Sequence, residues 1–464
     1  MDLTAYLNSI RGRSVGVIGI GISNTPLLSL LLRAGADVTA YDRKEESAFD
    51  RALLRSLREQ GCRFVFGEDY LSRLDRDLIF RTPGLHPRFL EEARQRGSEI
   101  TSEMEVFFQV CPCTTVAVTG SDGKTTTTTI ISKLLEAAGK TVHVGGNIGR
   151  PLLSEAENMR PEDYAVLELS SFQLMTMEKS PHIAVTTNLA PNHLDIHKDF
   201  AEYITAKENI FTHQSAEDIA VFNGDNALTQ AASKRAPGQV RLFSRRSPVD
   251  RGVYLAGDAS GAPAIWVSND RGRRMVLPLS GIKLPGVHNV ENYMAAIGAV
   301  DGLVADETVR AFAREFSGVE HRIELVRTLR GVRWYNDAIA SSPSRTIACL
   351  NAFSEKVILL AGGKDKGISY DPLGPVINDH VKSLILCGAT AGVIREAVER
   401  SENYAGLPIT EVPDWETAVH TAAETAKAGD VVVMSPASTS FDMFPNFMEK
   451  GRVFKALVNA LGKD

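Results

Sequence analysis

The segment Val116–Thr125 constrains the fold of this chain more than any other. A β-branched run, Thr114–Thr119, predicts a buried strand, and Gly120–Gly123 predicts a turn after it. Lys124 then opens an apolar helical period that ends near Gly139. A strand, a glycine loop and a helix in this order direct backbone N–H groups and the positive end of the helix dipole at one point. The segment therefore predicts an α/β fold with an anion-binding loop between strand and helix.

The residues at the start of this helix narrow the anion to a polyphosphate. In the run Gly-Lys-Thr, Lys124 would reach the outer phosphates of a nucleotide, and the Thr125 hydroxyl is placed to bind Mg²⁺. The general phosphate-loop pattern has a further glycine where this chain has Val118, so only its second half is matched. A plain glycine turn is the alternative, but a turn does not require Gly-Lys-Thr at a helix start.

Length and composition limit the classes of protein to which the chain can belong. Its 464 residues suggest about three domains, and 44% hydrophobic with 23% charged residues is typical of globular proteins with several cores. A net charge of -6 argues against nucleic-acid binding, which needs a basic face. We see no apolar run that could span a membrane and no secretory signal, so we expect a cytoplasmic protein. The five scattered cysteines then indicate reduced thiols.

The first hundred residues predict a small Rossmann-like domain. A buried strand, Ser14–Ile18, is followed by the glycine loop Gly19–Asn24, a helix, and a second strand that Asp42 closes. This is the layout of a dinucleotide fingerprint with an acid at the tip of the second strand. Asn24 replaces the third glycine and weakens an NAD interpretation. A nucleotide or its pyrophosphate still fits the loop, and a domain without a ligand is the alternative.

Polar side chains near later strand ends predict a metal site beside the phosphate loop. The strand Tyr164–Glu168 ends in a carboxylate, which we interpret as a metal ligand; a helix cap or solvent contact is the alternative. His193 lies in a polar loop after the strand His182–Thr187 and is not in an apolar period. Lys207 lies on the more apolar side of a helix, where lysine usually packs its stem and keeps its head in solvent.

The C-terminal part of the chain predicts a further α/β unit. Short runs between Ser244 and Leu279 first indicate an antiparallel β insertion in the central domain. A polar connector around Phe316–Arg322 follows. Four strands then alternate with helical stretches and predict a parallel sheet: Val332–Tyr335, Lys356–Leu360, Ser383–Cys387 and Asp430–Met434. Polar loops follow the strands, and ligands bind at this edge of open parallel sheets.

These residues together resemble one family, the ATP-dependent Mur ligases of peptidoglycan synthesis. The loop Thr119–Thr126 is similar to the family's variant phosphate loop, which also lacks the early glycine. Further similar motifs occur in the family's order between Gly19 and the C-terminus: Glu168–Leu174, Asn188 with Asn192–Asp195, Gly286–Asn289, Glu320–Arg322 and Ser435–Asp442.

The resemblance implies three domains and an activity. The domains would be a UDP-substrate-binding Rossmann-like domain at 1–104, a central ATP-binding domain at 105–316 and a C-terminal amino-acid-binding α/β domain at 317–464. The form of the motifs implies an ATP-dependent amide ligase that adds D-glutamate to UDP-N-acetylmuramoyl-L-alanine through an acyl phosphate. ATP and Mg²⁺ would be the cofactors. We expect a monomer in the cytoplasm, with no nucleic-acid partner and no membrane insertion.

The resemblance also implies site residues. The uridine nucleotide would contact Ile22, Ser23, Asp42, Arg43 and Gly84, and the muramoyl-alanine end would contact Asn147, Ser170 and His193. ATP would bind the loop residues Gly120, Ser121, Asp122, Gly123, Lys124, Thr125 and Thr126, with Asn289 on adenine, Arg322 on the γ-phosphate and Asp337 on the ribose. Metal ligands would be Thr125, Glu168, His193 and a carbamylated Lys207. The D-glutamate site would contain Ser341, Lys366, Ser440, Phe441 and Phe447. Lys124, His193, Lys207 and Arg322 would be the catalytic group.

The chain departs from the family pattern at several positions, among them Ser341, which stands where the family often has threonine. Ile339 stands where the family often has a lysine, and Asp122 replaces a common asparagine in the phosphate loop. A Mur or folylpolyglutamate-type ligase for another amino acid is the alternative within ligases. A NAD-dependent oxidoreductase and a non-catalytic nucleotide sensor are the alternatives from other classes; the sensor leaves Glu168, His193 and Lys207 without a role.

Overall fold

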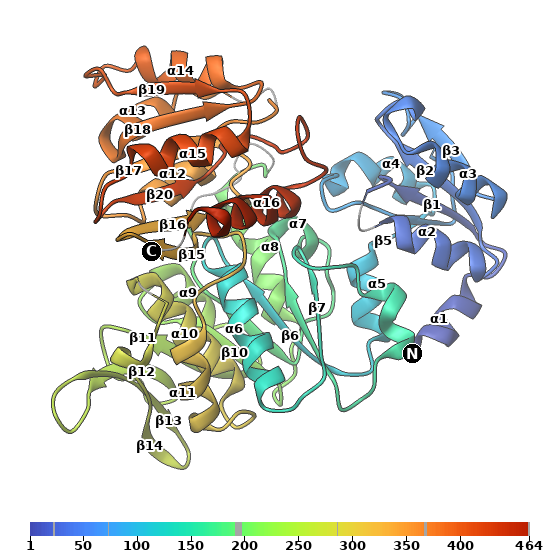
Figure 1. Cartoon of the computed structure of the whole chain (residues 1–464). Helices are drawn as coiled ribbons and strands as arrows, with labels where there is room; N and C mark the ends of the chain where they lie inside the picture. Colours follow the sequence, from blue (N-terminus) through green and yellow to red (C-terminus); the bar gives the residue numbers. More distant parts are fainter. Residues whose placement is uncertain (22–23, 73, 191–196, 285, 366–368, 463–464) are drawn as a thin grey trace. The chain divides into compact units, whose positions relative to one another are not determined.

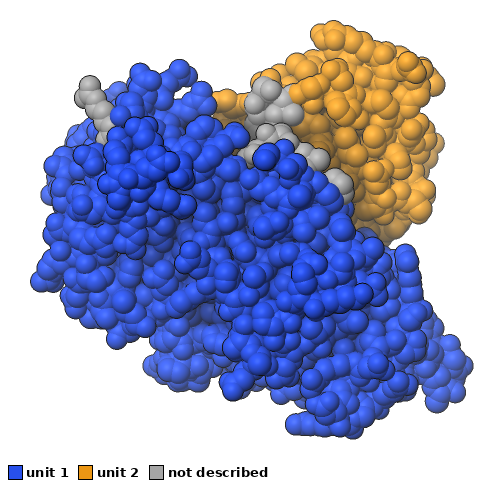
Figure 2. Space-filling model, turned by 180° about the vertical axis from the view of Figure 1, so that it is seen from behind, with its two compact units in different colours: residues 1–315 blue, residues 316–464 orange. Residues whose placement is uncertain are grey.

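Three β-sheets organise the described residues in the computed structural model of the chain (Figure 1). The structure describes all residues except 22–23, 73, 191–196, 285, 366–368 and 463–464. Two of the sheets belong to one compact unit, Met1–Glu315, and the third belongs to a second unit, Phe316–Asp464 (Figure 2). The predicted α/β class with parallel sheets is confirmed.

The first sheet has five parallel strands in the order β3-β2-β1-β4-β5. Its strands are β1 Ser14–Ile18, β2 Asp37–Asp42, β3 Arg63–Phe66, β4 Leu78–Phe80 and β5 Glu99–Thr101. The order changes direction between β1 and β4, and ligands bind at such a switch point in open parallel sheets. The two strand ends lie close together, since a Cβ on Gly19 would lie 3.2 Å from the Thr82 Cβ.

Short helices flank the first sheet. They are α1 Leu3–Ser9, α2 Asn24–Arg33, η1 Glu46–Ala48, α3 Arg51–Glu59, η2 Pro87–Leu90, α4 Glu91–Gln95 and α5 Glu103–Val110. Alternate residues of β1 face two different cores: Val15 and Val17 join the core that includes α2, while Ile18 joins a smaller core with Leu90 and Ala93. This is the period of a strand buried on both faces.

The central sheet has nine strands in the order β14-β13-β12-β11-β10-β9-β6-β8-β7 (Figure 1). The strands are β6 Thr114–Thr119, β7 Val142–Gly146, β8 Tyr164–Glu168, β9 Ile183–Thr186, β10 Ile219–Asn223, β11 Gln239–Ser244, β12 Gly252–Gly257, β13 Pro263–Asn269 and β14 Gly272–Pro278. The predicted antiparallel strands are present as β12 to β14. They extend the main sheet, because β12 pairs in parallel with β11.

Helices cover both faces of the central sheet. They are α6 Lys124–Ala137, η3 Leu153–Asn158, α7 Ser171–Leu174, α8 Phe200–Thr212, α9 Ala227–Ser233, η4 Leu279–Gly281, α10 Val287–Val300 and α11 Asp306–Glu315. Side-chain alternation on β10 separates the faces: Phe222 packs against Phe211 of α8, whereas Val221 lies beneath Gly298 of α10. Helices α6 and α10 pack side by side (Figure 1), so residues near their N-termini can meet.

The second unit has six strands in the order β15-β16-β20-β17-β18-β19. They are β15 Glu324–Leu329, β16 Val332–Asn336, β17 Val357–Ala361, β18 Val381–Cys387, β19 Ile409–Val412 and β20 Val431–Met434. The four predicted strands form the parallel centre, and the two edge strands, of which β15 is antiparallel, were missed. Both edge strands are only half-buried and therefore lack the apolar run that marks the central ones.

Five helices cover the two faces of this sheet: α12 Pro343–Leu350, α13 Leu373–His380, α14 Ala391–Glu399, α15 Trp415–Thr425 and α16 Phe447–Ala460. Strand β17 again divides its residues, with Leu359 in the core of α12 to α14 and Ile358 in the core of α15 and α16. Among the residues that the structure describes, every helix is too short or too polar to cross a bilayer. All five cysteines are free thiols, and four of them are buried.

One buried carboxyl makes the stability of the first unit depend on pH. Glu103 begins α5 and accepts a hydrogen bond of 2.8 Å from the Leu153 amide, and burial raises its pKa to about 7. The folded state therefore holds the proton more tightly than the unfolded chain, and this contribution is present below the unfolded value and is lost as the pH rises through about 7. The free energy of unfolding should fall by about 3 kcal/mol across that window.

Glu103→Gln keeps an acceptor for the Leu153 amide and removes the titration. The difference in unfolding free energy between variant and wild type, measured by urea denaturation from about pH 4 to about pH 8, should then change by the same amount. A difference that stays constant with pH would contradict this account of Glu103.

Candidate active site

The predicted phosphate loop lies between β6 and α6. Strand β6 is buried along almost its whole length, and Gly123 is the N-terminal cap of α6 in the left-handed conformation, with φ of 79°. Thr125 and Thr126 follow in the first turn of the helix, each 8% exposed. The loop therefore presents a helix N-terminus beside its glycines, which is the arrangement that binds phosphate through backbone N–H groups.

Two glycines of this loop leave no room for a side chain. A Cβ on Gly120 would lie 1.9 Å from Thr187 Oγ1, and a Cβ on Gly123 would lie 2.4 Å from Asn292 Oδ1. Thr187 donates a hydrogen bond of 2.6 Å to the Asp122 carbonyl, and Asn188 Oδ1 accepts one from the Asp122 amide at 2.9 Å. The segment after β9 and the start of α10 thus hold the loop from two sides.

Two lysines converge on one carbonyl oxygen of the loop. Lys124 Nζ donates to the Gly120 carbonyl at 2.8 Å, and Lys207 Nζ donates to the same oxygen at 2.9 Å and to Thr119 Oγ1 at 3.1 Å. Lys207 is 3% exposed and lies over the ring of Tyr203, with Nζ 4.9 Å from the ring centre. Burial, and then the charge of Lys124, lower the pKa of Lys207 well below its usual value. The head of Lys207 is buried and not in solvent.

Glu168 lies at the end of β8, one strand away from the loop. Its backbone pairs with Val118 of β6, and its Oε1 accepts a hydrogen bond of 2.7 Å from Asn147 Nδ2. Its Oε2 is buried with no hydrogen-bond partner among the described residues. A buried carboxylate oxygen without a partner is costly unless a cation compensates it. The predicted role of Glu168 as a ligand of Mg²⁺ stays a prediction, and its unpartnered oxygen is compatible with that role.

Residues around Ser170 and Asn289 complete the central site. Ser170 caps α7 and exchanges hydrogen bonds with Gln173. Asn292 on α10 accepts from Thr127 Oγ1 at 3.2 Å and donates to Asn289 Oδ1 at 3.1 Å, which places Asn289 close to α6. His193 lies outside the described residues.

The residues that we predicted for the uridine nucleotide belong to the first sheet and its loops. Asp42 at the tip of β2 accepts hydrogen bonds from the amides of Ile20 at 2.8 Å and Lys44 at 2.9 Å. Asn24 donates from Nδ2 to the Ile18 and Gly19 carbonyls, so the side chain that replaces the third glycine fills the fingerprint turn. This disfavours the oxidoreductase alternative, which needs a close backbone approach there. Arg43 and Gly84 are exposed, and Ile22 and Ser23 lie outside the described residues.

The remaining predicted residues lie in the second unit. Asp337 is 3% exposed, and its carboxylate accepts hydrogen bonds from Ser435 Oγ at 2.7 Å and the Ile323 amide at 3.2 Å. Burial raises its pKa to about 6. Arg322 is exposed and Ser341 is half-buried. The carboxylate of Asp337 is therefore engaged within its own unit, and its predicted ribose contact stays a prediction.

The second unit also contains two buried polar side chains, Ser440 and Lys450, of which we predicted only Ser440 for a site. Ser440 is 3% exposed and Lys450 is 1% exposed, and neither Ser440 Oγ nor Lys450 Nζ has a hydrogen-bond partner among the described residues. Lys450 Nζ lies over the Trp415 ring at 4.9 Å and 3.3 Å from the point that a Cβ on Gly363 would occupy. Burial lowers the pKa of Lys450 to about 8.

The one signal for Lys450 in the sequence is its place in the apolar stripe of α16 with Gly451, Phe454 and Val458, and this pattern does not show whether the ammonium group is buried. Of the other residues predicted for the amino-acid site, Phe441 is 65% exposed and Phe447 begins α16. Lys366 lies outside the described residues.

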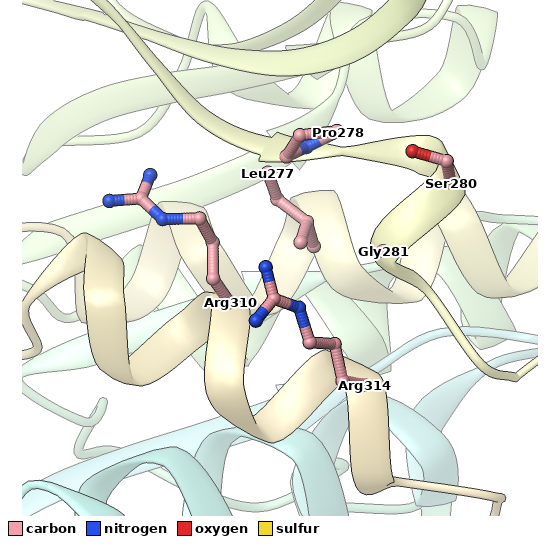
Figure 3. A pocket seen from close by; sticks show the side chains of 6 residues that line it. All are labelled: Leu277, Pro278, Ser280, Gly281, Arg310 and Arg314. Atoms are coloured by element: carbon pink, nitrogen blue, oxygen red, sulfur yellow. The ribbon is translucent and has the colours of Figure 1, made fainter.

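A small pocket lies elsewhere in the first unit. It has a volume of about 170 Å³, and Figure 3 shows Arg314 of α11 pointing toward Leu277 of β14, while the guanidinium of Arg310 points away from Leu277. Its lining consists of Leu277, Pro278, Ser280, Gly281, Arg310 and Arg314. These are not residues that we predicted for a site, and Arg310 is engaged by the Val276 carbonyl and Glu307.

Comparison with known proteins places the chain in a family. The Mur ligase middle domain matches residues 118–300, and the Mur ligase glutamate ligase domain matches residues 321–438. The chain belongs to the Mur ligase family, as the motifs indicated. It is 49% identical over 467 residues to the UDP-N-acetylmuramoylalanine–D-glutamate ligase of Acetivibrio thermocellus, with 99% of each chain covered. It is 48% identical over 456 residues to the enzyme of the same name from Clostridium kluyveri, with 97% of each covered.

A solved structure agrees with this fold. The UDP-N-acetylmuramate–alanine ligase from Thermotoga maritima matches with a TM-score of 0.57 at 19% identity, covering 97% of this chain and 100% of that chain. At this identity the likeness shows the fold alone.

The close approach at Gly123 can be tested against a matched glycine of the same helix. Gly139, after the C-terminus of α6, has φ of 76° and open space around its Cβ position. Alanine at either position should cost about 1–2 kcal/mol of stability because of the positive φ. Only Gly123→Ala should also weaken binding of a non-hydrolysable ATP analogue, by about tenfold or more, since its methyl group collides with Asn292.

The measurements are thermal unfolding and titration calorimetry on both variants. Equal losses of nucleotide affinity in Gly123→Ala and Gly139→Ala would contradict the role assigned to the loop.

Proposed function

We propose that the chain is an ATP-dependent ligase that adds D-glutamate to UDP-N-acetylmuramoyl-L-alanine during synthesis of peptidoglycan precursors in the cytoplasm. The observation that carries an ATP-dependent ligation is the convergence of Lys124 and Lys207 on the Gly120 carbonyl. The unpartnered oxygen of Glu168, one strand away, supports it. Identity over nearly the full length with ligases named for D-glutamate supports the choice of amino acid.

The chemistry explains why such a site is needed. A free carboxylate is a poor acceptor for an amine, because oxide would have to leave. Transfer of the γ-phosphoryl group of ATP to the carboxylate of the L-alanine residue gives an acyl phosphate and ADP. The amine of D-glutamate then attacks the acyl carbon, and the amide forms as phosphate leaves. Most of the catalysis in the first step is positioning and charge neutralisation, which the loop amides, Lys124 and Arg322 would provide.

Lys207 would act as a carbamate. Its buried amine is poised to be neutral, and a neutral amine adds to CO₂ with loss of a proton. The product places an anion next to Lys124, where a protonated Lys207 would instead repel the Lys124 ammonium. Thr125, Glu168, His193 and the carbamate would hold Mg²⁺, which when bound neutralises charge on the phosphate oxygens.

We assign the two other substrate sites to strand ends of the other two sheets and to the loops that follow them. The β1/β4 switch point, with Asp42, Arg43 and Gly84, would bind the uridine nucleotide. Asn147 and Ser170 would contact the muramoyl-alanine end. In the second unit, the unpartnered Ser440 hydroxyl and Lys450 ammonium suit a carboxylate, and D-glutamate carries two. The three-domain boundaries at 104/105 and 316/317 and a monomeric state belong to this proposal.

Amino-acid dependence is the direct test of the function. Phosphate release from ATP, measured with UDP-N-acetylmuramoyl-L-alanine, should depend on D-glutamate and be much slower with L-glutamate, L-lysine or diaminopimelate. With the amine held at the acyl carbon, L-glutamate, L-lysine and diaminopimelate cannot place two carboxylates where those of D-glutamate would lie. Each therefore leaves polar groups of the site unpaired, and such mismatches discriminate strongly. Turnover that is indifferent to D-glutamate would refute the proposed function.

Removal of the Lys207 amine tests the carbamate. Lys207→Ala should lose activity that bicarbonate does not restore, while short carboxylic acids restore part of it by supplying the missing anion. Wild-type enzyme depleted of CO₂ should lose activity and regain it with bicarbonate. Lys133→Ala, which removes an exposed lysine of α6 paired with Glu136, is the control and should behave as wild type. A Lys207→Ala variant that is active and indifferent to bicarbonate would rule the carbamate out.

A further inference from the structure

The loop Arg81–His86 follows a strand of the first sheet. Each end of this loop is hydrogen-bonded to a helix beside the central site. The loop follows β4 and contains Gly84, which we assign to the uridine nucleotide, and Thr82, which lies beside Gly19 in the loop after β1. Its first residue, Arg81, is 1% exposed. A buried guanidinium is costly unless its donors are used, so its partners show what the loop is fastened to.

Arg81 fastens the start of the loop to helix α7. Its Nη2 donates to the Phe172 carbonyl at 2.9 Å and to Thr176 Oγ1 at 2.7 Å, and its Nε lies 3.2 Å from the same hydroxyl. Both partners belong to the segment that begins with Glu168 and Ser170. The loop that carries Gly84 is therefore bonded directly to the part of the chain that carries the proposed metal ligand.

His86 fastens the end of the loop to helix α8. Its Nδ1 accepts a hydrogen bond from the Arg88 amide at 3.2 Å, so the ring proton lies on Nε2. Nε2 lies 3.4 Å from both carboxylate oxygens of Glu202, which can only accept. Glu202 is in the first turn of α8, the helix that also carries Lys207.

His197 closes this ring of contacts. Its ring stacks on Phe172, with centres 5.1 Å apart and planes 10° apart, and its Nε2 hydrogen-bonds with Ser171 Oγ at 2.8 Å. Its Nδ1 lies 3.3 Å from Glu202 Oε2. The contacts thus run from Arg81 to Phe172, then to His197 and Glu202, and back to His86 in the same loop.

Helix α8 in turn touches the phosphate loop at two points. The Tyr203 hydroxyl hydrogen-bonds with Ser121 Oγ at 3.0 Å, and Lys207 donates to the Gly120 carbonyl. The position of α8 therefore depends on Glu202 at its start and determines where the side chains of Tyr203 and Lys207 meet the phosphate loop.

We propose that Arg81 and His86 are positioning residues that couple binding of the uridine nucleotide at the Gly84 loop to binding of ATP at the phosphate loop. A nucleotide that orders the loop 81–86 would fix Phe172 and Glu202, and through them α7 and α8, in the arrangement that ATP requires. This rests on the proposed function, because it takes the uridine nucleotide and ATP as the two ligands.

The coupling is measured as a ratio of affinities. Titration calorimetry gives the dissociation constant of a non-hydrolysable ATP analogue without and with saturating UDP-N-acetylmuramoyl-L-alanine. The wild-type ratio should be about fivefold or more. In His86→Gln and in Arg81→Lys the ratio should approach one, while the affinity for UDP-N-acetylmuramoyl-L-alanine alone stays within about twofold of wild type. His143→Gln is the matched control, since it alters another histidine–carboxylate pair, with Asp163, on β7, and it should keep the wild-type ratio.

The outcomes separate this inference from the proposed function. Absence of any binding of UDP-N-acetylmuramoyl-L-alanine to the wild type would refute the function itself. Binding of both ligands with a wild-type ratio of one, or His86→Gln with an unchanged ratio, would overturn the coupling and leave the function standing. If Arg81→Lys lowers the thermal midpoint too far for titration, His86→Gln decides alone, because His86 lies near the surface and Gln keeps a donor.

Discussion

The structure of the central site depends on one carbonyl oxygen, that of Gly120. Two ammonium groups, from Lys124 and Lys207, donate to it, and like charges in a buried place repel each other. The arrangement is stable only if one amine is neutral or if negative charge is close by. Burial, and then the charge of Lys124, lower the pKa of Lys207, which favours the first solution. Polyphosphate and a carbamate on Lys207 would supply the second. The two lysines that meet at this oxygen thus explain both why the site attracts anions and why Lys207 is reactive.

The backbone around this oxygen is held by close contacts rather than by a large apolar core. Gly120 and Gly123 leave no space for a Cβ against Thr187 and Asn292, so the loop is enclosed by the segment after β9 and by α10. Such enclosure keeps the amides of the loop aimed at one point, which preorganises them for phosphate. Glu168 is fixed by the pairing of β8 with β6. Its Oε2, which has no hydrogen-bond partner among the described residues, also carries a negative charge that no hydrogen bond there compensates.

The first sheet contributes more than a separate binding module. Its loop 81–86 is bonded to α7 and α8, so the elements that carry Glu168 and Lys207 are attached to the elements assigned to the uridine nucleotide. A buried arginine and a part-buried histidine–carboxylate pair are costly choices for a mere packing interface, where apolar residues would serve. Their directional hydrogen bonds specify one arrangement of the two sheets within the first unit. This is why we assign them a positioning role.

Local patterns in the sequence determined much of this protein: the β8 strand Tyr164–Glu168, the loop and helix at Gly120–Lys124, and the family motifs. They succeeded because buried parallel strands and phosphate loops are encoded by residues adjacent in the chain. The half-buried edge strands β15 and β19 carried no such pattern. Only the tertiary structure decided that the ammonium groups of Lys207 and Lys450 are buried. It also decided that Arg81 and His86 contact α7 and α8. Those outcomes depend on contacts between residues distant in sequence, whose burial and charge no local pattern expresses.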